Sequence, residues 1–122
     1  MKVKLNLKER IALITVLPKE GSFKVVARTE ELKKKLLFTE EEDKKHGIIY
    51  TNDGRVLFNP SQFQGKENAR QLTQDYVLKT RKEFDIGETV EDEIESILKK
   101  LDNDKKLPAD YISLYEMFVD KK

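Results

Sequence analysis

The sequence contains no cysteine and no tryptophan, and it has only one histidine. Without cysteine there is no disulfide framework and no thiolate chemistry, which favours a reducing cytoplasm. No apolar run approaches the roughly 18 residues that a membrane span requires, and the first residues lack the continuous apolar core of a signal peptide. We therefore expect a cytoplasmic protein that does not span a membrane.

An excess of charge of either sign is also missing, because 24 Lys and Arg residues stand against 23 Asp and Glu residues. A dedicated nucleic-acid binder usually carries a basic excess or a basic block, so nucleic acid is not the expected partner. The 122-residue chain is 39% charged and 38% hydrophobic. Its apolar residues are patterned, so we predict one folded domain over residues 1–122 rather than disorder. Abundant Lys, Glu and Ile fit a thermophilic source or an AT-rich genome equally well.

The strongest helical pattern lies near the carboxyl end. Its apolar residues recur at i, i+4, i+7, i+8 and i+11 and form one stripe: Val90, Ile94, Ile97, Leu98 and Leu101. Residues 102–106 are polar and reverse the chain, and Pro108 suits the first turn of a second helix. We predict helices at about 89–101 and 108–119 that form an antiparallel pair. The second helix is expected to face the first through Tyr111, Ile112, Tyr115 and Phe118.

Three further helices are predicted upstream, at about 6–17, 22–37 and 39–46. The first is expected to bury one face through Leu7, Ile11, Ile14 and Val16 or Leu17, although its β-branched residues would also suit a strand. The second is expected to bury Val25, Thr29, Leu32 and Leu36. The third carries the clearest local signal, a capping box in which Thr39 and Glu42 satisfy each other's backbone N–H groups. Gly47 then suits a left-handed position that ends this helix.

The middle of the chain predicts β-structure. Two runs rich in β-branched and aromatic residues flank Asn52-Asp53-Gly54, which indicates a hairpin at about 48–58. Residues 61–75 carry four glutamines and few apolar residues and are expected to form a loop, with a short helix at 69–74 as the alternative. Alternation within 76–86 predicts one or two strands that extend the hairpin. The expected fold class is α+β, mainly helical, with a small antiparallel sheet in the middle and a C-terminal helical hairpin.

Few residues are arranged for catalysis or metal binding. His46 follows Glu42 and Asp43 at i−4 and i−3, but a zinc site needs three or four protein ligands, so a capped, solvated helix end is the better interpretation. The segment that begins at Asp102 lacks the glycine and the closing glutamate of a calcium loop. No glycine motif for phosphate binding occurs. We therefore expect a protein that is not an enzyme, with no catalytic residue, metal or cofactor.

Three helices followed by a hairpin also resemble the order of a winged helix. In that arrangement the third helix would enter the major groove of DNA. Here that helix carries four carboxylates, Glu40, Glu41, Glu42 and Asp43, which phosphates repel. The basic run Lys33–Lys35 is typical of a solvated helix end. A winged-helix-like, nucleic-acid-associated regulator is therefore the alternative function rather than the first.

Aromatic residues are the candidates for partner binding: Tyr111, Tyr115, Phe118, Phe63 and Tyr76. The first three recur at i, i+4 and i+7, a spacing typical of a buried core face. Tyrosine also serves well at an interface where one end of its side chain meets water. The sequence leaves core and interface open for this stripe.

Three short stretches carry a resemblance to a known group of proteins: Leu17–Phe23, Phe38–Glu42, and the ending Lys106-Leu107 with Leu114–Phe118. With these stretches the chain resembles small uncharacterised proteins of tailed phages and prophages. That group typically has Ser or Thr where this chain has Pro108, and the middle here is longer, so the resemblance gives no guidance for residues 60–86. It implies a phage or prophage origin and action in the cytoplasm of a bacterial host. We predict an accessory protein that binds a host or phage protein, with partner identity and self-association left open.

Overall fold

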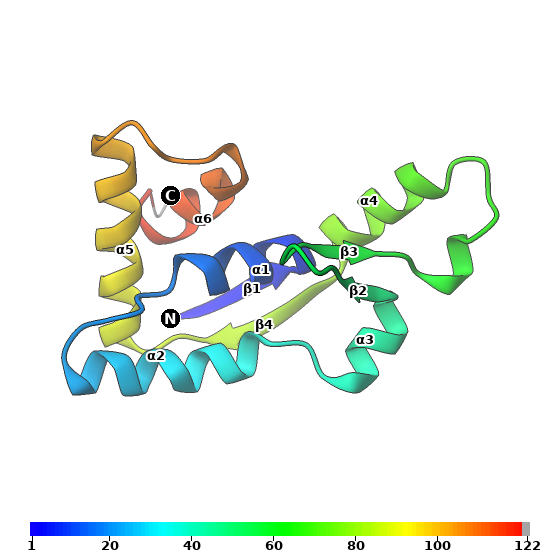
Figure 1. The fold of residues 1–122 in the computed structure, drawn as a ribbon. Helices are drawn as coiled ribbons and strands as arrows, with labels where there is room; N and C mark the ends of the chain where they lie inside the picture. Colours follow the sequence, from blue (N-terminus) through cyan, green and yellow to red (C-terminus); the bar gives the residue numbers. More distant parts are fainter. Residues whose placement is uncertain (121–122) are drawn as a thin grey trace. The chain divides into compact units, whose positions relative to one another are not determined.

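The computed structural model describes residues 1–120 and contains two compact units. Unit 1 combines Met1–Leu37 with the described residues from Arg81 onward, and unit 2 is the continuous segment Phe38–Thr80. Unit 2 is therefore an insertion between the two parts of unit 1, as the course of the chain in Figure 1 shows.

Unit 1 is a small antiparallel sheet with four helices. Its elements are β1 (Lys2–Asn6), α1 (Leu7–Val16), α2 (Phe23–Leu36), β4 (Arg81–Asp85), α5 (Glu88–Asn103), the 3-10 turn η2 (Ala109–Tyr111) and α6 (Ile112–Phe118). Strands β1 and β4 lie side by side and antiparallel, with Val3 opposite Phe84 (Figure 1). Helix α5 packs against α2 and α6, and α1 packs against α2. The fold is α+β and mainly helical, with the C-terminal helical pair that the sequence predicts.

One continuous apolar core runs through unit 1. Every strand and α-helix of the unit contributes to it, and its fully buried members are Leu5, Leu13, Leu36, Ile86, Ile94, Leu98, Leu114 and Phe118. In β1 the alternation of the sequence decides which residues enter the core, because Val3 and Leu5 are buried while Lys2 and Lys4 are exposed. Successive side chains of a strand point to opposite faces of the sheet.

Unit 2 consists of short elements. They are α3 (Glu40–His46), β2 (Ile48–Tyr50), β3 (Val56–Phe58), the 3-10 turn η1 (Ser61–Phe63) and α4 (Ala69–Lys79). Strands β2 and β3 form a two-stranded antiparallel hairpin in which Ile49 is opposite Leu57. The hairpin predicted at about 48–58 is thus confirmed.

The helix starts predicted near residues 6, 22 and 39 are confirmed by side-chain caps, whereas the helix predicted from residue 108 begins only at Ile112, after a 3-10 turn. Asn6 Oδ1 accepts from the Glu9 backbone N–H at 2.7 Å, and Glu9 Oε1 accepts from the Asn6 N–H at 2.9 Å. The same reciprocal box joins Thr39 and Glu42, with both distances at 3.1 Å. Gly47 ends α3 with φ of 61°, and a Cβ atom there would lie 2.1 Å from the Asn59 carbonyl oxygen. Only glycine therefore fits at this turn without displacing the backbone.

The strand prediction for residues 76–86 is correct only in its second half. Tyr76–Thr80 was expected to be a strand, but Tyr76 to Lys79 form the last turn of α4, and the helix considered at 69–74 is real and longer. Alternation over five residues is too short to distinguish a strand from one face of a helix. The expectation that the later strand extends the hairpin is wrong, because β4 pairs with β1. That pairing places Phe84 beside Val3 on one face of the sheet, where both are buried in the core.

Two predicted helix faces are also corrected. In α1, Leu7, Ala12, Leu13 and Val16 are buried, whereas Ile11 and Ile14 are only partly buried. In the last helix, Ile112 was expected in the core but is 53% exposed, and Leu114 is buried in its place. A 3-10 turn precedes α6, and its tighter winding rotates the face that follows.

Candidate functional site

The structure divides the five candidate aromatic residues between the two units. Phe118 is fully buried in the core of unit 1, and Tyr111 and Tyr115 are partly buried against the same core. Phe63 and Tyr76 lie in unit 2. The five residues therefore belong to two separate groups, and Phe118 is inaccessible to a partner while unit 1 is folded.

The two tyrosines at the edge of the core keep their hydroxyl groups near carboxylates. Tyr115 Oη donates to Asp102 Oδ2 at 3.3 Å. Partial burial, followed by the charge of Asp102, raises the pKa of Tyr115, and burial with the charge of Asp110 raises the pKa of Tyr111. Both phenols therefore remain protonated donors at neutral pH, which suits structural hydrogen bonds.

In unit 2, Tyr76 contacts both the single histidine and Phe63. The Nδ1 atom of His46 lies 2.6 Å from Tyr76 Oη, and the Phe63 ring meets the Tyr76 ring edge-on with centroids 5.9 Å apart. His46 is only 4% exposed. The helix end predicted for His46 is confirmed, but the prediction that His46 is solvated is wrong, because its ring packs against Tyr76. The sequence could not indicate this partner because Tyr76 lies on another helix. Within residues 1–120, no three His, Asp or Glu side chains are grouped to hold a metal ion.

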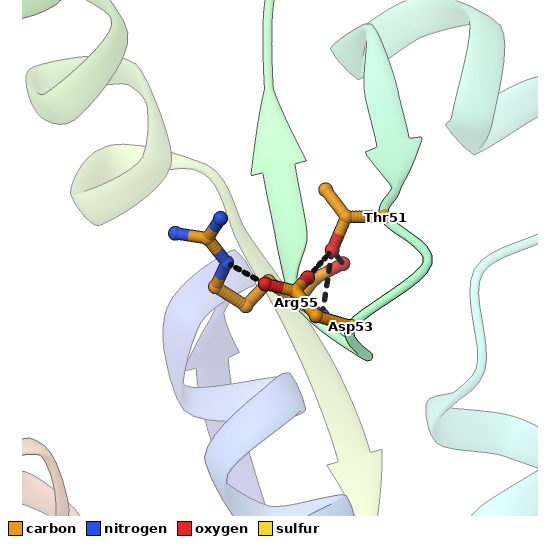
Figure 2. Close-up of polar contacts among 3 residues, drawn as sticks. All are labelled: Thr51, Asp53 and Arg55. Atoms are coloured by element: carbon orange, nitrogen blue, oxygen red, sulfur yellow. Dashed lines mark hydrogen bonds and ion pairs between the residues drawn. The ribbon is translucent and has the colours of Figure 1, made fainter.

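The tip of the hairpin is held by a local hydrogen-bond network. The Thr51 hydroxyl donates to Asp53 Oδ1 and accepts from the Arg55 backbone N–H at 2.9 Å. Arg55 Nε donates to Asp53 Oδ2 at 2.9 Å (Figure 2). The hydrogen bond from Thr51 is the largest of the causes that lower the pKa of Asp53. All three side chains are thereby engaged in shaping the turn.

The hairpin exposes apolar side chains on one of its faces. Ile49 is 47% exposed and Leu57 is 45% exposed. Because they are cross-strand partners, their side chains project from the same face; we call this pair the hairpin face. Tyr50 projects from the opposite face, and its hydroxyl donates to Asp43 Oδ1 at 2.8 Å. Neither Ile49 nor Leu57 was among the predicted site residues, because the sequence pattern of a short hairpin does not indicate which face stays exposed.

Two buried charged residues in α1 were also missed. Glu9 is 4% exposed and Arg10 is 1% exposed. Arg10 Nη2 donates to the Leu36 carbonyl oxygen at 2.9 Å, and Glu9 Oε1 accepts from Arg81 Nη1 at 3.2 Å. The guanidinium of Arg10 also lies over the Phe84 ring, 5.2 Å from its centroid. Arg10 thus binds the backbone at the end of α2, and Glu9 binds Arg81 of β4. Both charged residues therefore stabilise the fold.

Two hollows of unit 1 have linings of mixed charge. One, of about 320 Å³, lies where α2 meets the first residues of α5, and its lining combines Lys24, Arg28 and Lys35 with Glu31, Asp85 and Glu88. Arg28 Nη1 is already 3.7 Å from Glu31 Oε2. The other combines Arg81 and the amino group of Met1 with Glu9, Glu91 and Glu116. Neither lining selects a ligand of one charge.

Comparison with protein-family models, with curated proteins and with solved structures gives no match. In the part of the chain that the structure describes, no helix combines the length and the apolar character needed to cross a membrane.

Proposed function

We propose that the protein is a non-enzymatic phage or prophage accessory protein that acts in the cytoplasm of a bacterial host by binding a host or phage protein through the hairpin face. The observation that carries the proposal is the exposed cross-strand pair Ile49 and Leu57. Ile49 and Leu57 are adjacent aliphatic side chains, and the burial of such side chains against a partner drives protein association.

Unit 2 supports this assignment through the distribution of its apolar residues. Tyr50 and Leu78 of the same unit are 58% and 49% exposed, so apolar surface is not confined to one pair. A binding role is favoured over catalysis because the groups that could perform acid–base chemistry hold the structure together. His46 bonds to Tyr76, and Asp53 bonds to Thr51 and Arg55.

Affinity capture from a bacterial host lysate tests the proposal, with the double variant Ile49→Ser and Leu57→Ser beside the unchanged protein. Ile112→Ser is the matched control, because Ile112 is an exposed apolar residue of unit 1. We expect the unchanged protein and the control to retain the same partner after nuclease treatment. The double variant should bind at least about 30-fold more weakly, the cost of losing an interface hot spot. Equal binding by the double variant would reject the hairpin face.

The alternative, a winged-helix-like nucleic-acid-associated regulator, makes the opposite prediction. The order α1, α2, α3, β2, β3 matches that fold. However, α3 is seven residues long and begins with Glu40, Glu41, Glu42 and Asp43. Duplex DNA binding that weakens steeply as salt increases, together with loss of the captured partner after nuclease treatment, would favour this alternative.

A further inference from the structure

The two units differ sharply in how much of their interior is apolar. All fifteen residues of the buried apolar cluster lie in unit 1. Of residues 38–80, the structure buries only His46, Pro60 and Val77. One of these three is an imidazole that bonds to Tyr76. Unit 2 is therefore organised around a few ring contacts and hydrogen bonds, without an apolar core of its own.

This difference has a direct consequence for stability. Hydrophobic stabilisation grows with the apolar area removed from water, and segments below about 70 residues rarely bury enough of it without a staple such as a disulfide or metal. The chain contains no cysteine, so no disulfide strengthens unit 2. Its elements are short as well, since β2 and β3 have three residues each.

The residues of unit 1 that flank the insertion are bound by two side chains of α1. Where the chain leaves unit 1, Arg10 Nη2 donates to the carbonyl oxygens of Leu36 at 2.9 Å and Leu37 at 3.3 Å. Where the chain returns, Glu9 Oε1 accepts from Arg81 Nη1 at 3.2 Å. Two consecutive residues of α1 thus bind the residues that directly precede and follow the insertion. We call this pair the Glu9–Arg10 clamp.

The clamp contacts described above join groups of unit 1. Glu9 is fixed by the capping box with Asn6, and Arg81 lies opposite Asn6 in the β1–β4 pairing. Arg10 is fixed by its bonds to the end of α2 and by its position over Phe84. None of these contacts requires unit 2 to be folded.

We infer that unit 2 opens as a separate cooperative unit, at a lower free energy than unit 1, while the Glu9–Arg10 clamp continues to hold the residues of unit 1 that flank it. Proteins commonly open in such contiguous units, whose free energies range from near zero to the global value. Opening of residues 38–80 leaves the β1–β4 sheet and the core of unit 1 intact. The protein thus has a stable frame and an insertion that can order or disorder by itself.

Hydrogen exchange of the full-length chain under native conditions tests this inference. We expect the amides of α3, β2, β3 and α4 to share one protection level, at least about tenfold below that of the β1–β4 pairs and α5. Low concentrations of denaturant should change the exchange of the first group before that of the second. A single common protection level for both units would overturn the inference.

A pair of variants separates local from global opening. Gly47→Ala strains only unit 2, because residue 47 has φ of 61° and a Cβ atom would meet the Asn59 carbonyl oxygen. It should increase exchange throughout residues 38–80 and leave unit 1 unchanged. Ile94→Val removes one methylene from the core of unit 1 and should increase exchange there, with unit 2 unchanged.

The same pair remains informative if Gly47→Ala unfolds unit 2 completely. The amide resonances of unit 1 should then stay dispersed and protected, because the core residues and the clamp are unaltered. Collapse of the whole spectrum, or equal loss of protection in both units, would show that the chain is one cooperative structure and would overturn the inference.

Discussion

His46 and Tyr76 join the end of α3 to α4 through a contact of 2.6 Å between the imidazole Nδ1 and the phenol oxygen. Residues 30 positions apart are thereby linked inside unit 2, where His46 is 4% exposed. A buried polar atom that loses its partner costs more than the bond itself contributes, because water cannot replace that partner. Loss of this contact is therefore expected to destabilise unit 2.

Tyr76→Phe is expected to destabilise unit 2 by about 1–3 kcal/mol, since it leaves His46 Nδ1 buried without the hydroxyl. Protection of the α3 and α4 amides in hydrogen exchange measures the effect. Tyr50→Phe is the matched control, because its hydroxyl bonds to Asp43 at an exposed position, and it should cost less. Equal effects of the two variants would show that the buried contact contributes no more to stability than the exposed one.

The turn of the hairpin gives a pH-dependent prediction. The Thr51 hydroxyl stabilises the ionised form of Asp53 and lowers the pKa of Asp53 from its ordinary value of 3.8. The stabilisation is present above pH 3.8 and is lost as the pH falls through the lower, folded-state pKa. Thr51→Val should raise the pKa of Asp53 toward 3.8, measured by NMR titration of its carboxyl group.

Thr15→Val is the control for that titration. The Thr15 hydroxyl donates to the Ile11 carbonyl oxygen within its own helix at 3.1 Å, so its removal should leave the pKa of Asp53 unaltered. If Thr51→Val also leaves that pKa unaltered, the hydroxyl is not its main determinant.

Thr29 carries a buried hydroxyl for which the described residues provide no hydrogen-bond partner. Thr29→Val replaces this hydroxyl by a methyl group of similar size and removes an unsatisfied donor. We expect the free energy of unfolding of unit 1 to rise by about 0.5–1 kcal/mol, measured by chemical denaturation. A loss of more than about 1 kcal/mol would indicate that a water molecule satisfies this hydroxyl.

Phe118 and Ile112 test whether the C-terminal stripe acts in the core. Phe118 is fully buried and Ile112 is 53% exposed on the same helix. Phe118→Ala should lower the free energy of unfolding by about 3–5 kcal/mol, whereas Ile112→Ala should change it by less than about 0.5 kcal/mol. Calorimetry or urea denaturation measures both. An unchanged melting curve for Phe118→Ala would contradict the packing of α6.

Local interactions made much of the fold predictable from the sequence. Both capping boxes and the left-handed Gly47 depend on residues within three or four positions of each other, so their geometry follows from the sequence pattern. The hairpin follows in the same way from its turn residues. The apolar stripe of α5 is strong enough to predict Val90, Ile94 and Leu98 as buried.

Contacts between distant residues were decided only by the tertiary structure. The pairing of β4 with β1 joins residues about 80 positions apart, and no turn signal can specify such a partner. Which residues of α1 and α6 are buried depended on the elements against which these helices pack. His46 contacts Tyr76, and Glu9 accepts a hydrogen bond from Arg81; in each pair the two residues come from elements far apart in the sequence. Short-range propensity determined where the helices begin, whereas burial against distant elements determined which side chains form the core, the clamp and the exposed hairpin face.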